Sequence, residues 1–574
     1  MTAYLNGSEE SLRALVNILN DFELLSGLKI NLSKCKAVWI GNQRFENKII
    51  CSDLKIIWSN KFRLLGINFD ADLSKMDTNF KDKMEEIKIL YKSWLYRSLT
   101  PIGRITVIKT LAIPKLSHIV LVCPHMEDQL LSDLETLSFQ FLWKGKPDRV
   151  QRKHVTLPYG KGGLNMPDIG KFWDGLKMAW IRRVQGSKDI WWKLLQLNLL
   201  HSNYEAFDIW YGGPNRLREI SGKLSNKFWA ETFKIAGNMM EETPFAHPHL
   251  FYHLNLFDND LFATNDIPLR RNEFRILWSK GLAQIADFFE TNDIPAKLLS
   301  LQDLNDKYNM KLDFLSYHRI KTSIELGSKR LNDKTSNLDL SDLVAPRQPI
   351  LFKLCNLKKR GCKIFYKTLR ARDFMANSTE AAEKKWQNVI NMTFSIRFWD
   401  DCWNLLRNIY IDNNTRWIQY QIVKYILPTN YSVNKYNPNQ NPNCTFCHFN
   451  SHLEQLPYLF WDCPKVKHFW LGVENFLKIF HPTFRLSQRK AIFGATEETD
   501  EVNAILLWSK RYIWVQKFTS KKLETTAFFN FIKHKISLHM MVAQQKEDLD
   551  KFLKGWVKIV EFLGIKILPK LAIQ

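Results

Sequence analysis

The sequence lacks an apolar run long enough to cross a membrane. A membrane-spanning helix needs about 20 predominantly apolar residues, whereas the strongest candidate, LAIPKLSHIVLVCP at residues 111–124, is shorter and is broken by proline. The first residues, MTAYLNGSEES, are polar and acidic, unlike a signal peptide. We therefore expect an intracellular protein of the nucleus or cytoplasm that has no membrane partner.

Cysteines and acidic residues are scarce as well. Nine cysteines, an odd number spread thinly, argue against a disulfide framework and for a reducing compartment. The 58 Asp and Glu residues are outnumbered by 82 Lys and Arg residues, which gives a formal net charge of +24. Such a surplus favours a polyanionic partner, most simply nucleic acid, although basic surfaces also occur on proteins that bind none.

Large apolar side chains, in contrast, are abundant. The chain has 20 Trp and 38 Phe, and hydrophobic residues make up 45% of it, which excludes a disordered chain. Its 574 residues suffice for roughly four domains. Amphipathic helical patterns recur along most of the chain, so we expect a mainly α fold with an α+β N-terminal part.

One stretch gathers residues with a specific chemistry. Cys444 and Cys447 are separated by two residues, which lets a tight turn direct both thiolates at one metal ion, and Cys463 follows directly before a proline. Zinc, which takes four sulfur or nitrogen ligands, is the natural candidate. Among the histidines nearby, His468 lies five residues after Cys463 on an expected helix and points away from its sulfur, so His452 is the better fourth ligand. The alternative is a set of reduced, partly buried cysteines.

This segment resembles the C-terminal part of the reverse transcriptases of long interspersed elements, the non-LTR retrotransposons. Their pattern is C-x2-C…E…H-L-F-x-x-C-P…F-W, and the chain matches it at Cys444, Cys447, Glu454, Leu459, Phe460, Cys463, Pro464, Phe469 and Trp470. It departs from the pattern at Tyr458, which stands in the place of the family's histidine. A neutral phenol is not a usual zinc ligand. The resemblance therefore implies a zinc-binding module in which His452 substitutes, or a site that has decayed.

The first 72 residues contain a second match. We expect a helix that is capped by Asn6 and ends at Gly27, then a turn, and strands at residues 37–40 and 62–69. In the family, an aromatic-Ala-Asp-Asp strand of the palm is followed by such a helix, by G-L-x-I-N-x-x-K and by L-G-I. The resemblance implies that Lys34 lies near the outgoing pyrophosphate, and that Leu65 and Gly66 belong to the hairpin that grips the primer end. Without the family, Lys34 is as well explained as a solvated turn lysine.

The catalytic aspartates of that palm strand are missing from the chain. Nucleotide transfer needs two Mg²⁺ ions held by carboxylates, so magnesium is expected only in the intact polymerase. Two other acidic pairs make poor replacements. Asp70 and Asp72 are expected in a surface turn that opens the next helix, and Asp400 and Asp401 in a mainly helical segment.

A third match concerns two predicted helices at residues 84–99 and 101–116. Thr100 and Pro101 are typical of a helix start, and the second helix combines an apolar face with Arg104, Lys109 and Lys115. The family has a similar pattern in its thumb, which implies that these cations contact the phosphate backbone of a duplex. The alternative is that they are surface cations without a partner.

Residues 141–169 change character. Prolines and the Gly162-Gly163 pair indicate extended segments and a hairpin. The cations of this segment are Lys144, Lys146, Arg149, Arg152 and Lys153, with Lys161 further on, and Trp143 and Tyr159 lie among them. Basic and aromatic residues together suit RNA, whose bases stack and whose phosphates pair with cations.

The family also has a close counterpart of the basic segment, F-x-W-x-G-K…P…G-G-L-x-x-P-D, and the same order of helix, turn and C-x2-C before Cys444. The resemblance therefore spans nearly the whole chain, because five short motifs occur in the family's order. It implies the end of a palm (residues 1–72), a thumb (73–140), a basic segment (141–185), a helical linker (186–440), a cysteine-rich module (441–475) and a C-terminal helical segment (476–574). We expect the chain to bind RNA, an RNA–DNA hybrid or a DNA duplex without synthesising DNA alone. Two alternatives stay open: a structural or protein-interaction module retained by a host, and a truncated open reading frame of an active RNA-directed DNA polymerase.

Overall fold

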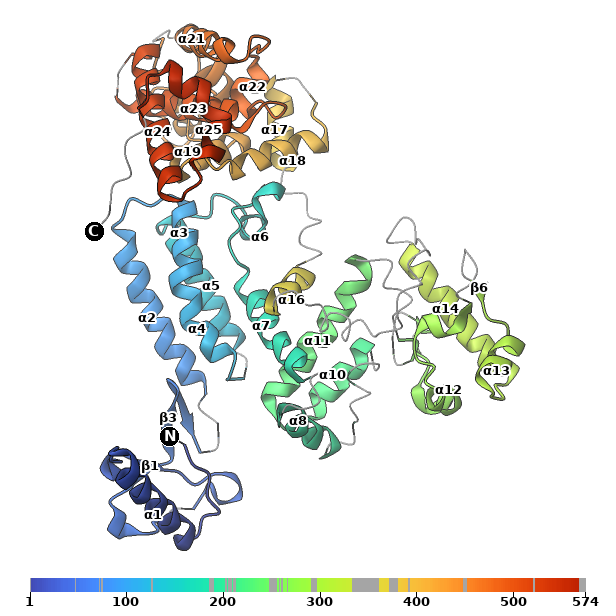
Figure 1. Ribbon diagram of the computed structural model, residues 1–574. Helices are drawn as coiled ribbons and strands as arrows, with labels where there is room; N and C mark the ends of the chain where they lie inside the picture. The colour runs from blue at the N-terminus through green and yellow to red at the C-terminus, as the bar shows by residue number, and fades with distance from the viewer. Residues whose placement is uncertain are drawn as a thin grey trace. The chain divides into compact units, whose positions relative to one another are not determined.

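Figure 1 shows the computed structural model of the chain. It describes residues 2–46, 48–71, 73, 76–124, 127–184, 190–201, 204, 209, 213–246, 255–257, 259, 262–265, 267–290, 297–332, 361–370, 380–390, 393–447, 452–519 and 522–566. The chain divides into two compact units. Unit 1 comprises Met1–Trp94, Leu111–Leu137 and Ile169–Arg372, and unit 2 comprises Leu95–Thr110, Ser138–Asp168 and Asp373–Gln574.

The expectation of a mainly helical fold is confirmed. The α-helices are α1 (Glu9–Ser26), α2 (Asp77–Leu95), α3 (Pro101–Val107), α4 (Ile113–Val120), α5 (Asp128–Trp143), α6 (Arg152–Val155), α7 (Ile169–Val184), α8 (Ile190–His201), α10 (Gly213–Lys223), α11 (Lys227–Ala246), α12 (Arg275–Ser279), α13 (Leu301–Tyr308), α14 (Phe314–Asn332), α16 (Gly361–Leu369), α17 (Glu380–Ile390), α18 (Ile396–Asn404), α19 (Asn413–Val423), α20 (Asn430–Asn434), α21 (Pro464–Phe480), α22 (Gln488–Phe493), α23 (Asp500–Thr519), α24 (Thr525–Gln545) and α25 (Leu549–Phe562). None of the described helices is both long and apolar enough to span a bilayer.

The strands are few and short. They are β1 (Lys36–Ala37), β2 (Ile57–Trp58), β3 (Lys61–Leu64), β4 (Ile67–Asp70), β5 (Phe289–Glu290) and β6 (Lys297–Leu298), and they form three two-stranded sheets among the described residues. β1 pairs with β2 in parallel, whereas β3 with β4 and β5 with β6 are antiparallel. The sheets are too small to organise a core, so packing between helices determines the fold.

The N-terminal segment differs in detail from the expectation. Helix α1 is capped by Ser8, whose side chain accepts a hydrogen bond from the Ser11 amide at 3.2 Å, while Asn6 accepts one from the Ser8 amide. Gly27 ends the helix in the left-handed conformation at φ 70°, as expected. The first expected strand shrinks to the two residues of β1.

Residues 62–69 form a hairpin and not the single strand that we expected. Phe62 pairs with Phe69, and the loop between the strands is Leu65-Gly66. Both loop residues have positive φ, 48° and 84°, as two-residue hairpin loops require to match the twist of the strands. The apolar alternation changes phase at the loop, from Phe62 and Leu64 to Ile67 and Phe69. Only the family resemblance had implied a hairpin at Leu65-Gly66.

Unit 1 contains separate hydrophobic cores. Helices α7, α10, α11 and α16 pack around residues such as Leu217, Phe233 and Phe365. Residues 256–324 have a core of their own, which includes Phe257, Phe274 and Ile320. Figure 1 shows α10 beside α11 and α16 beside α7.

Unit 2 is organised around the C-terminal helices. Figure 1 shows α17 to α25 gathered in one bundle. Helix α19 packs against α3, α22 and α23.

The start of α3 is as predicted, because the Thr100 side chain accepts from the Gly103 amide at 3.2 Å and Pro101 takes the first turn. The helix that was expected over residues 101–116 changes at Ile108–Ala112 into a π-helix before α4 begins. Pro114 explains the change, because it cannot donate the backbone hydrogen bond that a continuous α-helix needs.

Residues 141–168 do not form the extended hairpin that we expected. After α5 ends at Trp143, the chain turns through Lys144 and Gly145, both with positive φ, and continues in the short helix α6. The Gly162-Gly163 turn is present, and the Gly163 amide donates to the Pro158 carbonyl at 3.1 Å. A Cβ on Gly163 would lie 2.0 Å from the Leu157 carbonyl oxygen, so the turn packs more tightly than a side chain permits.

This close approach makes Gly163→Ala a test of the loop's packing. We expect the variant to lower the free energy of unfolding of unit 2 by about 1–3 kcal/mol, because backbone and side chain atoms must move apart. Gly103→Ala in the same unit is the matched control, since its Cβ would meet neighbours only at 3.5 Å or more. Equal urea midpoints for the two variants would contradict the packing.

A second test uses Lys510, which is buried in α23 and donates to the Ile492 carbonyl at 3.0 Å. Burial lowers the pKa of its amine to about 7. Between pH 7 and pH 10 the unfolded chain therefore binds more protons than the folded chain, and stability should rise by up to about 1.4 kcal/mol per pH unit.

Lys510→Met should reduce this pH dependence and not abolish it, because burial also lowers the pKa of Lys424 to about 7. Lys533→Met, at an exposed position of α24, should leave it unchanged. Urea unfolding at several pH values measures both. An unaltered slope in Lys510→Met would exclude Lys510 as its source.

Candidate metal centre and nucleic-acid interface

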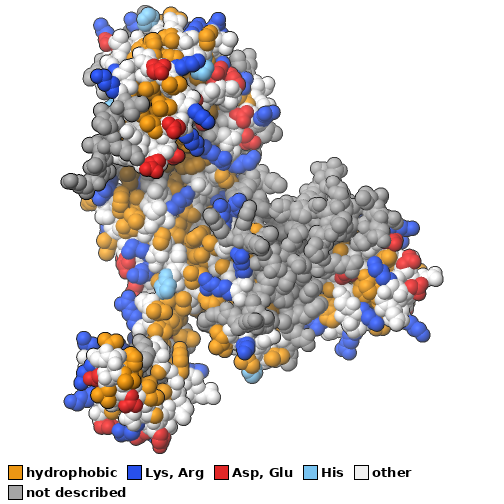
Figure 2. All heavy atoms as spheres, viewed as in Figure 1, with side chains coloured by type: hydrophobic (Ala, Val, Ile, Leu, Met, Phe, Trp, Pro, Cys, Tyr) orange, Lys and Arg blue, Asp and Glu red, His pale blue; other side chains and the backbone are white. Residues whose placement is uncertain are grey.

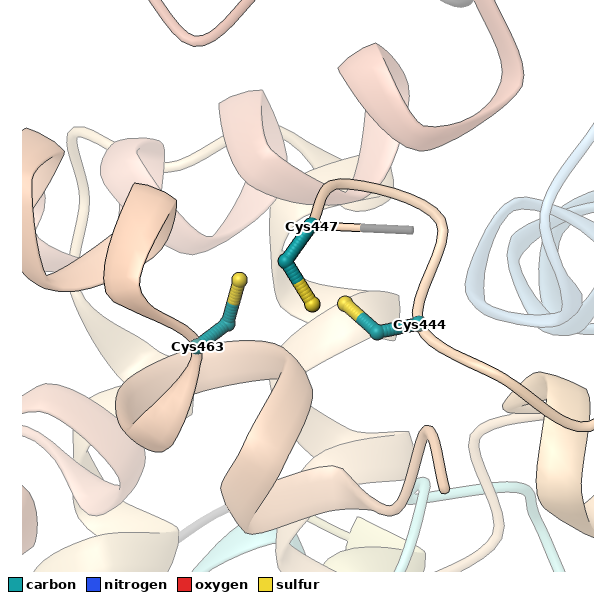
Figure 3. A group of neighbouring side chains, drawn as sticks. All are labelled: Cys444, Cys447 and Cys463. Carbon is teal, nitrogen blue, oxygen red and sulfur yellow. The ribbon is translucent and has the colours of Figure 1, made fainter. Parts of the chain in front are cut away.

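Cys444, Cys447 and Cys463 converge in unit 2. Their sulfur atoms all lie within 4.8 Å of one another. Cys444 and Cys463 are buried and Cys447 is half-buried. Figure 3 shows the three side chains directed toward a common point, two from one loop and the third from the start of a helix. Among the residues that the structure describes, this is the group of His, Cys, Asp or Glu side chains arranged to hold a metal ion.

Local structure fixes the three cysteines. Asn443 forms an isolated bridge with Leu453, and the Cys444 amide donates to the His452 carbonyl at 3.1 Å, which closes the loop that carries the first two cysteines. Cys463 lies between the π-helix η13 (Tyr458–Asp462) and α21, where Pro464 occupies the first turn as predicted.

The sulfur atoms are electrostatically unequal. A hydrogen bond from the Cys444 thiol, together with the Val466 and Lys465 amides at the start of α21, holds the pKa of Cys463 below its usual value. The same hydrogen bond is the main cause that raises the pKa of Cys444, and burial is the second cause. Without metal, therefore, Cys463 loses its proton more easily than Cys444 does.

A buried carboxylate holds the cysteine loop to the helical bundle. Glu454 is fully buried, with 0% exposure, and forms an ion pair with Lys517 of α23. It also accepts from the Thr445 amide at 3.1 Å, from the Thr445 hydroxyl at 2.8 Å and from the Asn430 amide at 3.0 Å. Thr445 stands between the two cysteines of the loop. The sequence identified Glu454 only as a member of the family motif. It did not predict the ion pair, because Lys517 lies 63 residues away and no local pattern connects the two residues.

The structure does not support His452 as the fourth ligand. Its ring is exposed, stacks on the Tyr458 ring with centroids 5.1 Å apart, and is not part of the sulfur group. The His452 carbonyl accepts a hydrogen bond from the Cys444 amide, which fixes the backbone of His452. The His452 side chain lies against the Tyr458 ring. His468 is exposed on α21, as its spacing predicted, and His448 lies outside the described residues. The Tyr458 hydroxyl lies 3.4 Å from the Cys447 sulfur.

Three sulfurs in this arrangement can hold a metal ion such as zinc. Structural zinc sites are built mainly from thiolates at a Zn–S distance of about 2.3 Å. The burial of two cysteines and the preformed loop reduce the ordering that metal binding would otherwise require.

The cations of the basic segment lie at the surface of unit 2. The exposed side chains are Lys144, Lys146, Arg149, Arg152, Lys153 and Lys161. Arg152 pairs with Asp148 at 2.8 Å and Lys161 with Asp400 at 3.5 Å. On the face in Figure 2, Lys and Arg side chains are spread over all the described surface, among acidic and apolar ones. The basic segment is therefore one part of a widely distributed positive charge.

The aromatic residues of this segment have another role than we expected. Trp143 is buried and lies against Trp417, with ring centroids 6.2 Å apart, and Tyr159 is half-buried. Trp143 therefore packs in the interior of unit 2 and is not available for stacking with bases. A large aromatic ring stabilises the fold more when it is buried than when it is exposed.

The cations of the expected thumb are also differently placed. Arg104 is 5% exposed, and its guanidinium donates to the Leu142 and Leu99 carbonyls at 2.6 Å each. Lys109 is half-buried, and burial lowers its pKa. Lys115 in unit 1 pairs with Glu86 at 2.9 Å. Arg104 thus fastens α3 to the end of α5 and is buried there, whereas the resemblance implied that it contacts the phosphate backbone of a duplex.

The remaining expected residues lie at the surface of unit 1. Lys34 ends the 3-10 turn η1 (Leu32–Lys34) and is exposed. Leu65 stands at the hairpin loop with 83% of its surface exposed, next to Gly66. Asp70 ends β4, and Asp72 lies outside the described residues. In unit 2, Asp400 and Asp401 lie in helix α18, as expected.

No family model matches this chain. The relation to LINE-type reverse transcriptases therefore remains a prediction from the sequence motifs.

The buried ion pair provides a prediction. Glu454→Gln should lower the free energy of unfolding of unit 2 by about 3–5 kcal/mol, because Lys517 would remain buried without a counter-charge. Glu497→Gln is the control in the same unit, since Glu497 pairs with Lys490 at an exposed position and should contribute less than about 1 kcal/mol. If both variants unfold at the wild-type urea concentration, Glu454 does not hold the loop.

Proposed function

We propose that the chain is the C-terminal portion of a LINE-type reverse transcriptase that binds RNA or a primer–template duplex through phosphate contacts. The exposed cations at residues 144–153 are the observation that carries the proposal. They are closely spaced and belong to a chain with a net charge of +24. Phosphate contacts of this kind position a nucleic acid without selecting its sequence.

The proposed interface consists of Lys144, Lys146, Arg149 and Lys153, with Arg152 as a partly neutralised member. Arg104 is left out, because its donors are occupied by carbonyl groups inside the fold. Lys34 and the hairpin loop Leu65-Gly66 also belong to the proposal. They are surface groups, and the sequence motifs alone assign them to a partial palm. DNA synthesis would require the magnesium-binding aspartates of an intact polymerase.

The second part of the proposal is a zinc ion with a structural role at Cys444, Cys447 and Cys463. The support is the convergence of three sulfurs, two from a loop that Glu454 ties to the bundle and one from the start of α21. A metal there would join the loop to the start of α21 and so stiffen the cysteine-rich module.

A protein-interaction module is the second candidate, and one observation favours it. Several large apolar side chains of the N-terminal segment are exposed: Tyr4, Ile18, Phe22, Leu24, Leu25 and Leu28. Ile18, Phe22 and Leu25 lie on one face of α1 by their spacing. An apolar face of this kind is typical of a surface that another protein segment covers.

Filter binding across a salt series separates the two candidates. We expect single-stranded RNA and an RNA–DNA hybrid to bind at low salt and to dissociate steeply as salt rises, because each phosphate contact releases counterions. Alanine at Lys146, Arg149 and Lys153 should reduce the log–log slope by about 2.

The matched control replaces three exposed lysines of unit 1, Lys280, Lys311 and Lys321, by alanine. This control has the same change in charge and should keep the wild-type slope. An equal loss in both variants would show that net charge and not the proposed interface binds RNA. The absence of binding at low salt would leave the protein-interaction module.

A further inference from the structure

The three sulfurs account for three corners of a tetrahedron. Structural zinc is almost always four-coordinate. Within the described part of the chain, however, no fourth Cys, His, Asp or Glu joins the three cysteines. A site with three protein ligands would keep a position for water, which is typical of catalytic zinc. The identity of the group at the fourth corner therefore decides what kind of site this is.

The Tyr458 hydroxyl occupies the space beside the sulfurs. It lies 3.4 Å from the Cys447 sulfur. Tyr458 begins the π-helix η13, and its carbonyl accepts from the Cys463 amide at 3.0 Å, so one turn fixes both residues. The exposed His452 ring lies on the Tyr458 ring at an interplanar angle of 26° and limits its rotation.

The distance between the Tyr458 oxygen and the Cys447 sulfur agrees with the distance between two ligands of one zinc ion. With Zn–S near 2.3 Å and Zn–O near 2.0 Å, a tetrahedral angle separates sulfur from oxygen by about 3.5 Å. The observed separation of 3.4 Å is close to this value. The corresponding S–S separation is about 3.8 Å, and the three sulfurs lie within 4.8 Å of one another. The one sulfur–oxygen distance and the limit on the sulfur–sulfur distances are therefore compatible with ligands of one ion.

A phenol beside three cysteines is protonated until a dication is present. A bound divalent ion favours the anionic form of each group that coordinates it. The protons of the thiols and of the phenol would pass to solvent on binding, as is general for protein metal sites. No oxidant or further reactant is involved.

We propose that Tyr458 is the fourth ligand, and that its phenolate oxygen completes a zinc site with Cys444, Cys447 and Cys463. The inference rests on the zinc binding proposed above. It makes the site a closed structural one, and it assigns to Tyr458 the role that the sequence had suggested for His452.

The test is zinc affinity of the full-length protein, measured by competition with a chromophoric chelator and paired with the visible spectrum of the Co²⁺ form. Tyr458→Phe should bind zinc at least about tenfold more weakly, because metal sites lose this much even when a supporting residue is removed. It should also shift the Co²⁺ bands. Tyr458→His should recover tight binding, because imidazole is a good zinc ligand.

Two histidine variants complete the design. His468→Ala, at an exposed position of α21, should bind zinc as the wild type does. His452→Ala should weaken binding much less than Tyr458→Phe. Wild-type affinity and spectrum in Tyr458→Phe, or a larger loss in His452→Ala, would overturn the inference while leaving the metal site intact. If Cys463→Ser and the wild type take up equal zinc, the metal site itself fails and the inference with it.

Discussion

The buried ion pair between Glu454 and Lys517 is the interaction on which the cysteine-rich module depends. Both groups are withdrawn from water, and Glu454 also accepts hydrogen bonds from Thr445 and Asn430. Removing one partner of a buried charge pair lowers the stability of the fold strongly, because the remaining charge has no solvent to stabilise it. The loop that carries Cys444 and Cys447 is therefore positioned by electrostatics before any metal binds. A preformed loop of this kind lowers the entropic cost of bringing three thiolates together.

The charge of the chain has two different roles. Some cations are structural: Arg104 and Lys510 donate to backbone carbonyls, and Lys517 neutralises Glu454. Others, such as Lys146 and Arg149, are exposed. The sequence cannot separate the two classes, because burial depends on helices that are distant along the chain. Only the second class supports the proposed contact with phosphate groups, so the net charge of +24 overstates the cations available to a nucleic acid.

The sequence predicted what local patterns determine. The Thr100-Pro101 start of α3, the Gly27 end of α1 and the helical character of the C-terminal region follow from capping and periodicity. The hairpin at Leu65-Gly66 was implied by the family resemblance but not by the strand pattern, and the loop after α5 was mistaken for extended structure because its prolines and glycines permit several turns. At the metal centre, spacing identified the three cysteines. Spacing favoured His452 over His468, and Tyr458 was set aside because a neutral phenol is not a usual zinc ligand, whereas the folded chain brings the Tyr458 hydroxyl to 3.4 Å from the Cys447 sulfur.

In the proposed closed metal site, three cysteines and one tyrosine hold one zinc ion, and Glu454 fixes the loop that carries Cys444 and Cys447. X-ray absorption at the zinc edge of the loaded full-length protein measures the ligands directly. We predict a first shell of three sulfur atoms at about 2.3 Å and one oxygen at about 2.0 Å. A shell with two sulfurs or fewer, or one whose light ligand shows the outer-shell scattering of an imidazole ring, would contradict this account.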